Sequence, residues 1–140
     1  MTIRVGINGF GRMGRLVVRA LRLHPELELV HVNELQGGID TAAHLLEFDT
    51  VHGRYAGSVA VDGDRLVVDG RAVGFSEHPR PADLDWDGLG VDVVLEATGK
   101  FKTVADLVPH LDRGARAVVV ACPVKDADVL NVGMGCNDNL

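Results

Sequence analysis

The stretch IRVGINGFGRMGR, residues 3–15, decides how this chain folds. Its apolar first part, residues 3–7, predicts a short buried strand, and a helical pattern begins near Gly11. Gly9, Gly11 and Gly14 have the spacing G-x-G-x-x-G at this junction. The first glycine permits a tight turn, the second lets backbone approach a phosphate, and the third lets the helix pack closely on the strand. The stretch therefore predicts a dinucleotide-binding turn, with the start of the helix facing a pyrophosphate.

An acidic residue follows the next predicted strand. That strand covers residues 27–32, and Glu34 lies 20 residues beyond Gly14. A carboxylate at this spacing accepts hydrogen bonds from ribose hydroxyls and repels a 2′-phosphate. Residues 35–37 supply no arginine that would reverse this preference, so we predict NAD rather than NADP. The alternative is a purely structural turn with Glu34 at a solvated strand end, and the strand, turn, helix and acid in register favour the cofactor.

Length, charge and hydropathy narrow the class of protein. A chain of 140 residues with 46% hydrophobic residues predicts one domain, residues 1–140, with a real core. No apolar run approaches the ~20 residues of a membrane span, and the start lacks a secretory apolar core, so we expect a cytoplasmic protein with no membrane partner. The net charge is −6, yet residues 1–25 contain five arginines and no acid. No basic patch is interleaved with aromatic residues, which disfavours nucleic acid as a partner.

Apolar periodicity and turn residues predict the order of the elements. We expect helices over residues 11–23, 42–48 (after a cap at Asp40 or Thr41) and 104–111, and strands over residues 58–61, 65–68, 72–75, 91–95, 116–121 and 130–134 in addition to the first two. Repeated strand-then-helix units predict an α/β, doubly wound, mostly parallel sheet, and the glycine-punctuated middle strands predict a small antiparallel excursion. The turns at residues 9–14, 33–34, 97–99 and 121–123 should then face one crevice.

Several blocks of the sequence resemble the phosphorylating glyceraldehyde-3-phosphate dehydrogenases. Residues 6–15 closely match the opening of that family. The similarity continues in the family's order through Asn33-Glu34, FDTVHG (48–53), ATGKF (97–101), ACP (121–123) and MGCN (134–137). Residues 41–49 are most similar to the branch associated with arsenate resistance. The resemblance implies a Rossmann-type NAD-binding domain of a glycolytic oxidoreductase.

The same resemblance implies roles for individual residues. Arg12 and Met13 would pass backbone N–H groups to the pyrophosphate. Glu34 would take the place of the family's usual aspartate at the adenosine ribose, and Thr98 and Gly99 would flank the cofactor.

Two further positions differ from the family pattern. His78 stands where the family commonly has an arginine near the adenine, in a loop about one residue shorter, and Ala121 stands where a serine is common. The replacement at Ala121 loses a hydroxyl and weakens one contact. The complete set of cofactor-binding residues predicted here is Gly9, Gly11, Arg12, Met13, Gly14, Glu34, His78, Thr98, Gly99 and Ala121.

The family's chemistry implies residues that the quoted blocks do not contain. A cysteine thiolate attacks the aldehyde beside a histidine base, hydride passes to NAD, and phosphate releases an acyl phosphate. In the family that cysteine lies in a Ser-Cys-Thr-Thr-Asn-Cys segment shortly beyond the point that matches Asn137. We therefore expect the NAD-binding half of such an enzyme, truncated before the catalytic domain and inactive alone. The resemblance implies that an aldehyde phosphate binds only with that domain and that the complete protein is a homo-oligomer.

The other reactive residues favour structural roles. Cys122 precedes Pro123 at a strand end, where a small core residue is expected, and neither it nor Cys136 has a motif-linked base, so we predict no catalytic residue and no disulfide. The six histidines lack metal-ligand spacing, so we predict no metal. Asp49 and His52 lie in a block that the resemblance assigns to a loop and to subunit packing rather than to acid–base chemistry.

Two other functions stay open from the sequence. One is a stand-alone NAD-binding module that acts as a sensor or pairing partner without chemistry. The other is the nucleotide half of another semialdehyde or sugar-phosphate dehydrogenase, because substrate choice lies in the other half of such enzymes. In every case we expect exposed apolar surface on the isolated chain, and hence low stability or self-association.

Overall fold

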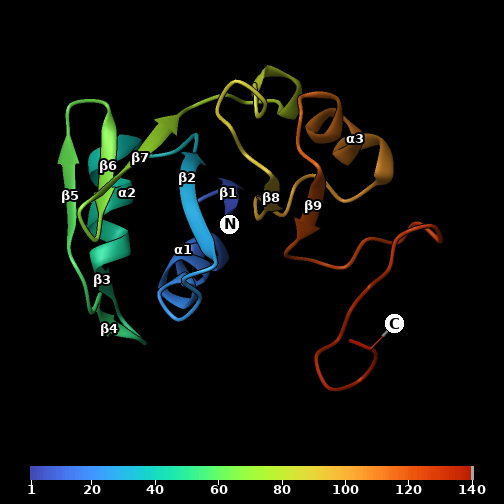
Figure 1. The fold of residues 1–140 in the computed structure, drawn as a ribbon, viewed down its shortest axis with the longest axis horizontal. Helices are drawn as coiled ribbons and strands as arrows, with labels where there is room; N and C mark the ends of the chain where they lie inside the picture. Colours follow the sequence, from blue (N-terminus) through green and yellow to red (C-terminus); the bar gives the residue numbers. More distant parts are fainter. Residues whose placement is uncertain (140) are drawn as a thin grey trace.

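The computed structural model describes residues 1–139, and a seven-stranded sheet forms its centre (Figure 1). Along the chain the elements are β1 (Ile3–Asn8), α1 (Arg12–Leu21), β2 (Leu27–Asn33), α2 (Gly38–Glu47), β3 (Phe48–Asp49), β4 (Gly53–Arg54), β5 (Val59–Asp62), β6 (Arg65–Val68), β7 (Arg71–Ser76), the 3-10 helix η1 (Pro81–Asp83), β8 (Val93–Glu96), α3 (Val104–Asp112) and β9 (Ala117–Val120). The strand order is β5-β6-β7-β2-β1-β8-β9. In this order the five strands β7, β2, β1, β8 and β9 run parallel to one another. The pairs β5–β6 and β6–β7 are antiparallel. The predicted α/β sheet with an antiparallel excursion is confirmed.

Side chains alternate between the two faces of the sheet and build two cores. On one face Val5 and Ile7 of β1 pack with Val18 of α1 and with Leu46 of α2. On the other face Val94 of β8 packs with the loop residues that follow η1, including the fully buried Trp86. Helix α3 contacts η1 and β9 on this second side. Helical layers therefore cover both faces, as expected of a doubly wound, Rossmann-type sheet.

Two tight turns set the register of the antiparallel strands. Asp62 pairs with Arg65 across the first hairpin, so Gly63 and Asp64 form a two-residue turn. The second turn has Asp69 at φ 51° and Gly70 at φ 78°. Positive φ at both positions is the geometry of a type I′ hairpin, which Asp-Gly favours. This turn leads into β7, which then pairs in parallel with β2. The excursion is thus an extension of the main sheet.

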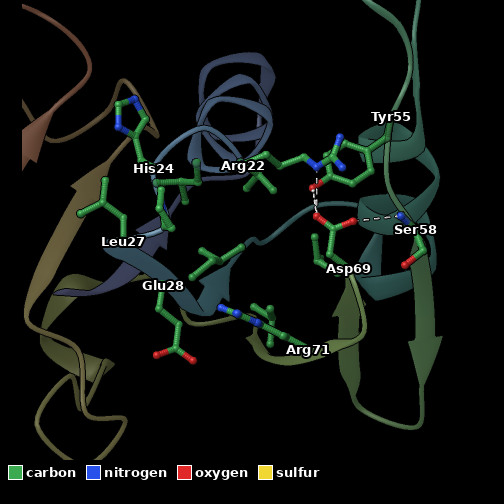
Figure 2. A pocket seen from close by; sticks show the side chains of 14 residues that line it. Arg22, His24, Leu27, Glu28, Tyr55, Ser58, Asp69 and Arg71 are labelled. Atoms are coloured by element: carbon green, nitrogen blue, oxygen red, sulfur yellow. Dashed lines mark hydrogen bonds and ion pairs between the residues drawn. The ribbon is translucent and has the colours of Figure 1, made fainter. Parts of the chain in front are cut away.

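A polar cluster fastens these strands to α1. The Asp69 carboxylate accepts hydrogen bonds from the Tyr55 hydroxyl at 2.9 Å, from the Ser58 N–H at 3.0 Å and from Nε of Arg22 at 3.2 Å. Figure 2 shows these side chains at one side of a hollow of about 580 Å³ between α1, β2 and the hairpins. Burial, together with the neighbouring carboxylate, raises the pKa of the Tyr55 hydroxyl well above its usual range. Tyr55 therefore stays a neutral donor to Asp69.

The second helix begins earlier than the sequence predicts. A cap at Asp40 or Thr41 is wrong, because α2 starts at Gly38 and its N-cap is Gly37, with no capping side chain. Gly37 and Gly38 have φ of 83° and 70°, which L-residues rarely adopt. A Cβ on Gly37 would lie 2.7 Å from a methyl carbon of Thr41. The two glycines turn the chain directly into the helix, and no side chain caps its start. The pattern of capping residues in the sequence therefore does not indicate where this helix begins. Helix α1 also ends two residues before the predicted Leu23.

The predicted strand over residues 130–134 is wrong. In the described part of the chain these residues have no strand partner, and Figure 1 shows the segment after β9 leaving the sheet. The Asn131 side chain instead accepts from the Val124 N–H at 3.0 Å and donates to its carbonyl at 2.9 Å. Leu130, Val132 and Met134 are all exposed. The apolar run indicated a buried strand, but a strand forms only where an edge pairs with it.

We expect the apolar side chains around β9 to cause self-association. Val119 is 54% exposed, and the apolar residues of the following segment are exposed on the same part of the chain. Val119→Lys places a charge there and should shift the chain from mixed oligomers toward monomer in analytical ultracentrifugation. Leu23→Lys changes an exposed apolar residue outside this segment and should leave the distribution as in the wild type. A wild-type chain that is monomeric at high concentration would contradict this expectation.

A buried histidine makes stability depend on pH. His31 of β2 is 5% exposed, and its Nε2 lies 2.8 Å from the Ser76 hydroxyl oxygen. Its Nδ1 has no hydrogen-bond partner in the described residues, and a Cβ on Gly74 would lie 2.5 Å from it. Burial, with a smaller contribution from His78, lowers the pKa of His31 from 6.5 to about 4. The imidazole is therefore neutral in the folded chain near pH 6.

Because the folded pKa lies below the unfolded one, His31 favours the folded state fully only above pH 6.5. As pH falls toward 4 the unfolded state binds the proton preferentially, and up to about 3 kcal/mol of stability is lost. We expect denaturant melts of the wild type to show this loss, and His31→Gln to lack it. His44→Gln, at an exposed histidine that has no ion pair among the described residues, is the matched control and should keep the wild-type slope. Parallel pH profiles for wild type and His31→Gln would refute the assignment.

Candidate nucleotide-binding site

A hollow of about 160 Å³ lies where β1, β2 and β8 end. It is lined by Asn8, Gly9, Gly11, Asn33, Glu34, Leu35, Gln36, His78, Pro79, Ala97, Thr98, Lys100 and Phe101. Three of the four turns that were predicted to share a crevice therefore meet here. The fourth, with Ala121 and Cys122, lines a separate hollow of about 480 Å³ beside β9. Strand ends at the carboxyl edge of a parallel sheet are the usual place for a ligand in this architecture.

The three glycines of the turn have different surroundings. A Cβ on Gly9, whose φ is 93°, would lie 2.6 Å from the backbone nitrogen of Thr98. A Cβ on Gly14 would lie 2.3 Å from the carbonyl oxygen of Gly9. A Cβ on Gly11 would meet nothing within 4 Å. Gly9 and Gly14 are thus required for packing within the chain, whereas Gly11 borders open space into which a ligand fits.

The first turn of α1 is arranged to receive an anion. Its N-cap, Gly11, makes no side-chain cap, and the first turn contains no acid. The first backbone bond of the helix runs from the Arg15 N–H to the Gly11 carbonyl at 3.1 Å. The N–H groups of Arg12, Met13 and Gly14 precede that bond, so the helix itself offers them no acceptor. With the positive end of the helix dipole, these groups fit a pyrophosphate.

The Arg12 side chain points to a neighbouring turn. Its Nη1 lies 3.3 Å from the Asp49 carboxylate, between α1 and the small β3–β4 hairpin. That carboxylate also accepts from the N–H groups of His52 at 2.7 Å and Val51 at 2.8 Å, which hold the pKa of Asp49 well below its usual range. Asp49 thus closes a loop, and its contact with His52 belongs to that turn. The subunit-packing role of this block stays a prediction.

Glu34 is held against the glycine turn. One carboxylate oxygen accepts from the Phe10 N–H at 2.6 Å, and the other accepts from the Gln36 N–H at 3.0 Å. Each oxygen of a carboxylate can accept more than one hydrogen bond. Glu34 therefore keeps acceptor capacity toward the hollow that it lines. The acid and the uncapped start of α1 lie together, as ribose and pyrophosphate of one dinucleotide require.

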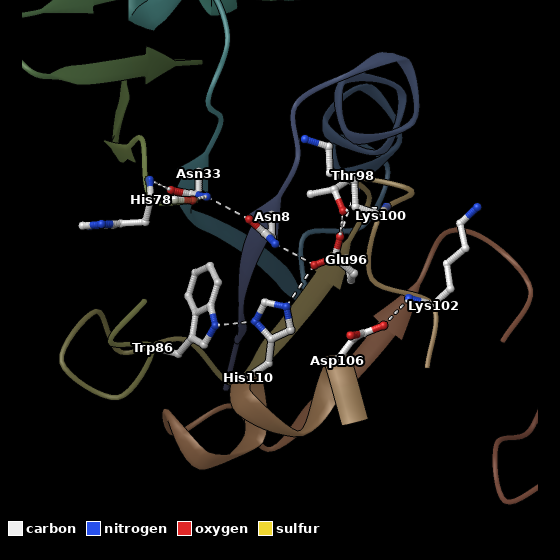
Figure 3. A network of polar contacts seen from close by, with 10 residues as sticks. All are labelled: Asn8, Asn33, His78, Trp86, Glu96, Thr98, Lys100, Lys102, Asp106 and His110. Atoms are coloured by element: carbon white, nitrogen blue, oxygen red, sulfur yellow. Dashed lines mark hydrogen bonds and ion pairs between the residues drawn. The ribbon is translucent and has the colours of Figure 1, made fainter. Parts of the chain in front are cut away.

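The remaining predicted residues occupy different places. Thr98 lines the hollow, and Gly99 lies in the same turn with φ 69°. His78 also lines it, and Figure 3 shows its imidazole extending away from Asn33, which binds the His78 backbone at 2.8 and 2.9 Å. Ala121 donates its N–H to the Glu96 carbonyl at 2.9 Å and packs against the first core. Contacts of all the predicted residues with the cofactor stay predictions.

Sequence reasoning missed the polar residues at the strand ends. Asn8, Asn33 and Glu96 are the last residues of β1, β2 and β8, and all three are buried. Figure 3 shows their side chains linked in one network. The available signal is a polar residue directly after an apolar run, repeated at three strands whose carboxyl ends meet. Lys100 and Phe101 also line the hollow and could have been found from the same turn.

Among residues 1–139 no group of three or more His, Cys, Asp or Glu side chains could hold a metal ion. No helix within this part of the chain is long and apolar enough to cross a membrane.

Comparison with known proteins gives the family. The protein-family model described as "Glyceraldehyde 3-phosphate dehydrogenase, NAD binding domain" matches residues 3–104. The chain belongs to this family. Its cofactor is NAD, and the sheet described above is the nucleotide-binding fold of these enzymes.

Curated relatives agree with this membership along the whole chain. The chain is 54% identical over 140 residues to glyceraldehyde-3-phosphate dehydrogenase 3 of Nostoc, and the match covers 100% of the chain and 41% of that protein. It is 44% identical over 139 residues to the enzyme of Geobacillus stearothermophilus, covering 99% and 41% respectively. The enzyme of Streptomyces coelicolor is 46% identical, with the same coverage. The chain thus spans about two fifths of the length of these relatives.

The surroundings of the glycines predict opposite outcomes for two alanine substitutions. Gly11→Ala should change the free energy of unfolding by less than about 1 kcal/mol, yet weaken NAD binding at least about tenfold because its methyl enters the ligand space. Gly14→Ala forces backbone apart and should cost about 1 to 3 kcal/mol of stability. Isothermal titration with NAD and denaturant melts measure both. If Gly11→Ala binds NAD as the wild type does, the pyrophosphate does not lie at this turn.

Proposed function

We propose that this chain forms the NAD-binding half of an NAD-dependent glyceraldehyde-3-phosphate dehydrogenase. The observation that carries the proposal is the position of the Glu34 carboxylate, hydrogen-bonded to the Phe10 N–H of the glycine turn. An acceptor for ribose hydroxyls and an uncapped helix N-terminus for phosphate then lie side by side. Relatives named as this dehydrogenase, 54% and 44% identical, support the assignment.

Each residue of the site has a part in this proposal. The N–H groups of Arg12 and Met13 bind the pyrophosphate, with Gly9, Gly11 and Gly14 shaping the turn beneath it. Glu34 binds the adenosine ribose. When bound, NAD accepts the hydride of the reaction, and Thr98 with Gly99 orients it from the turn after β8. His78 contacts the adenine side of the cofactor, and Ala121 borders it from the end of β9.

The proposal extends to the complete protein. We expect a homo-oligomeric, cytoplasmic enzyme of glycolysis that oxidises an aldehyde phosphate through a thioester, without nucleic-acid or membrane partners. Cys122 and Cys136 are both free thiols, half-buried and exposed respectively, and neither belongs to the family's catalytic segment. We therefore expect these 140 residues alone to bind NAD without oxidising an aldehyde phosphate.

Titration of the purified chain with NAD tests the function. We expect heat of binding with NAD, and no NADH absorbance when an aldehyde phosphate and phosphate are added. NADH formation by this chain alone would contradict the expectation that it binds NAD without oxidising an aldehyde phosphate. Absence of NAD binding by the folded chain would refute the proposed function itself. A complete protein that also contains the catalytic domain should form NADH with glyceraldehyde 3-phosphate. NADH formation only with another aldehyde would assign a different dehydrogenase.

Glu34→Gln tests the choice of cofactor. The amide keeps the size of the side chain but loses the charge, so NAD binding should weaken about tenfold, the usual worth of a charged hydrogen bond. Binding of NADP should weaken less or improve, because the repulsion of a 2′-phosphate is removed. Glu28→Gln, on β2 away from the hollow, is the matched control and should bind both nucleotides as the wild type does. An unchanged ratio of NAD to NADP affinity in Glu34→Gln would exclude Glu34 from the ribose.

A further inference from the structure

Glu96 is a buried carboxylate beside the nucleotide site that the roles above do not use. It ends β8, is 1% exposed and does not line the hollow. One oxygen accepts from the Asn8 amide at 2.6 Å and from Nε2 of His110 at 2.9 Å. The other accepts from the Thr98 N–H at 2.9 Å and from the Thr98 hydroxyl. Each oxygen of the carboxylate thus accepts two hydrogen bonds, which satisfies it although it is buried.

The tautomer of His110 follows from its other neighbour. The indole Nε1–H of Trp86 lies 2.9 Å from Nδ1 of His110, and an indole nitrogen can only donate. Nδ1 must therefore be the unprotonated nitrogen, and the one N–H of the ring is on Nε2, facing Glu96. Trp86 and His110 are both 0% exposed. The His110 ring thus donates its Nε2–H to the Glu96 carboxylate and is held in one orientation by a buried indole (Figure 3).

Through its partners Glu96 reaches two walls of the hollow. Asn8 is aligned in the sheet with Glu96 on one side and Asn33 on the other, and the Asn33 amide donates to the Asn8 side chain at 2.8 Å. The Thr98 hydroxyl accepts from the Lys100 N–H at 3.1 Å, which leaves its own proton for Glu96. Asn8, Asn33, Thr98 and Lys100 all line the hollow.

We propose that Glu96 is a positioning residue for NAD. It fixes the strand-end amides that form one wall of the site and the turn at Thr98 that forms the other, and His110 with Trp86 fixes Glu96. A buried carboxylate is costly unless it is fully hydrogen-bonded, and apolar residues in its place often give an equally stable core. The Glu96 carboxylate therefore serves to place the two walls of the hollow. This inference rests on the proposed NAD binding at the same hollow.

The test compares Glu96→Gln with Val94→Ala. The glutamine keeps the shape but leaves at least one donor unpaired, and NAD binding should weaken about tenfold or more. Val94, fully buried two residues before Glu96 on the same face of the strand, has no side-chain hydrogen bonds and gives a variant destabilised by a cavity alone. Titrations of both at a temperature where each is folded should show wild-type NAD affinity for Val94→Ala only. Wild-type affinity in both variants, or the same loss of affinity in both, would overturn the positioning role.

Nitrogen NMR provides readouts that a general loss of stability would not move. In the wild type the His110 ring should show protonation at Nε2 and a bare Nδ1, and the Thr98 amide resonance should move in Glu96→Gln but not in Val94→Ala. Trp86→Phe serves if Glu96→Gln does not fold: it leaves Nδ1 of His110 without its donor and should weaken NAD binding several-fold. Wild-type affinity in that variant refutes the arrangement.

The two proposals fail separately. If the wild type binds no NAD, the proposed function is refuted. The hydrogen-bond network is then judged by the His110 and Thr98 resonances alone, and a protonated Nδ1 or an unmoved Thr98 amide would overturn it too.

Discussion

The hydrogen bond from the Phe10 N–H to the Glu34 carboxylate, 2.6 Å long, joins the two parts of the nucleotide site. Phe10 lies inside the glycine turn, immediately before the N-cap of α1. The bond therefore sets the distance between a charged acceptor and the electropositive start of the helix. A neutral ribose suits the first and an anionic phosphate suits the second. The Glu34 side chain makes this contact by reaching back from the end of β2 to the turn after β1.

The sheet brings together groups that are far apart in the sequence. Strands β1, β2 and β8 are parallel neighbours, so their last residues form a row at one edge. Most positions within these strands are apolar because both faces of the sheet are covered. The three residues of the row at the edge are polar, and their side chains hydrogen-bond to one another in the interior. The polar row and the glycine turn are therefore two products of the same topology.

Much of this could be predicted from residues 3–34, because the signals there are local. Spacing of glycines and apolar runs predict β1, α1 and β2, and the structure has each of them. The place of the ligand, predicted from the same glycines and one acid, stays a prediction. The start of α2 could not be predicted from capping residues, because the helix follows a glycine with positive φ, Gly37, and has no capping side chain. A strand over residues 130–134 was predicted from composition, but pairing depends on a distant edge. The network of Glu96 combines residues 14 and 88 positions apart, and no spacing rule within one element contains that information.

Two buried ionisable groups show how the supply of hydrogen bonds decides charge in this core. His31 has one polar contact at Nε2 and none at Nδ1 among the described residues, so burial dominates, its pKa falls to about 4 and it remains neutral. Glu96 is at least as deeply buried, yet four donors surround it. Donors of that number and alignment can replace the hydration that a carboxylate loses on burial. The chain thus buries a fully hydrogen-bonded carboxylate where amides and a hydroxyl must be held in place, and keeps His31 neutral where the sheet needs only packing.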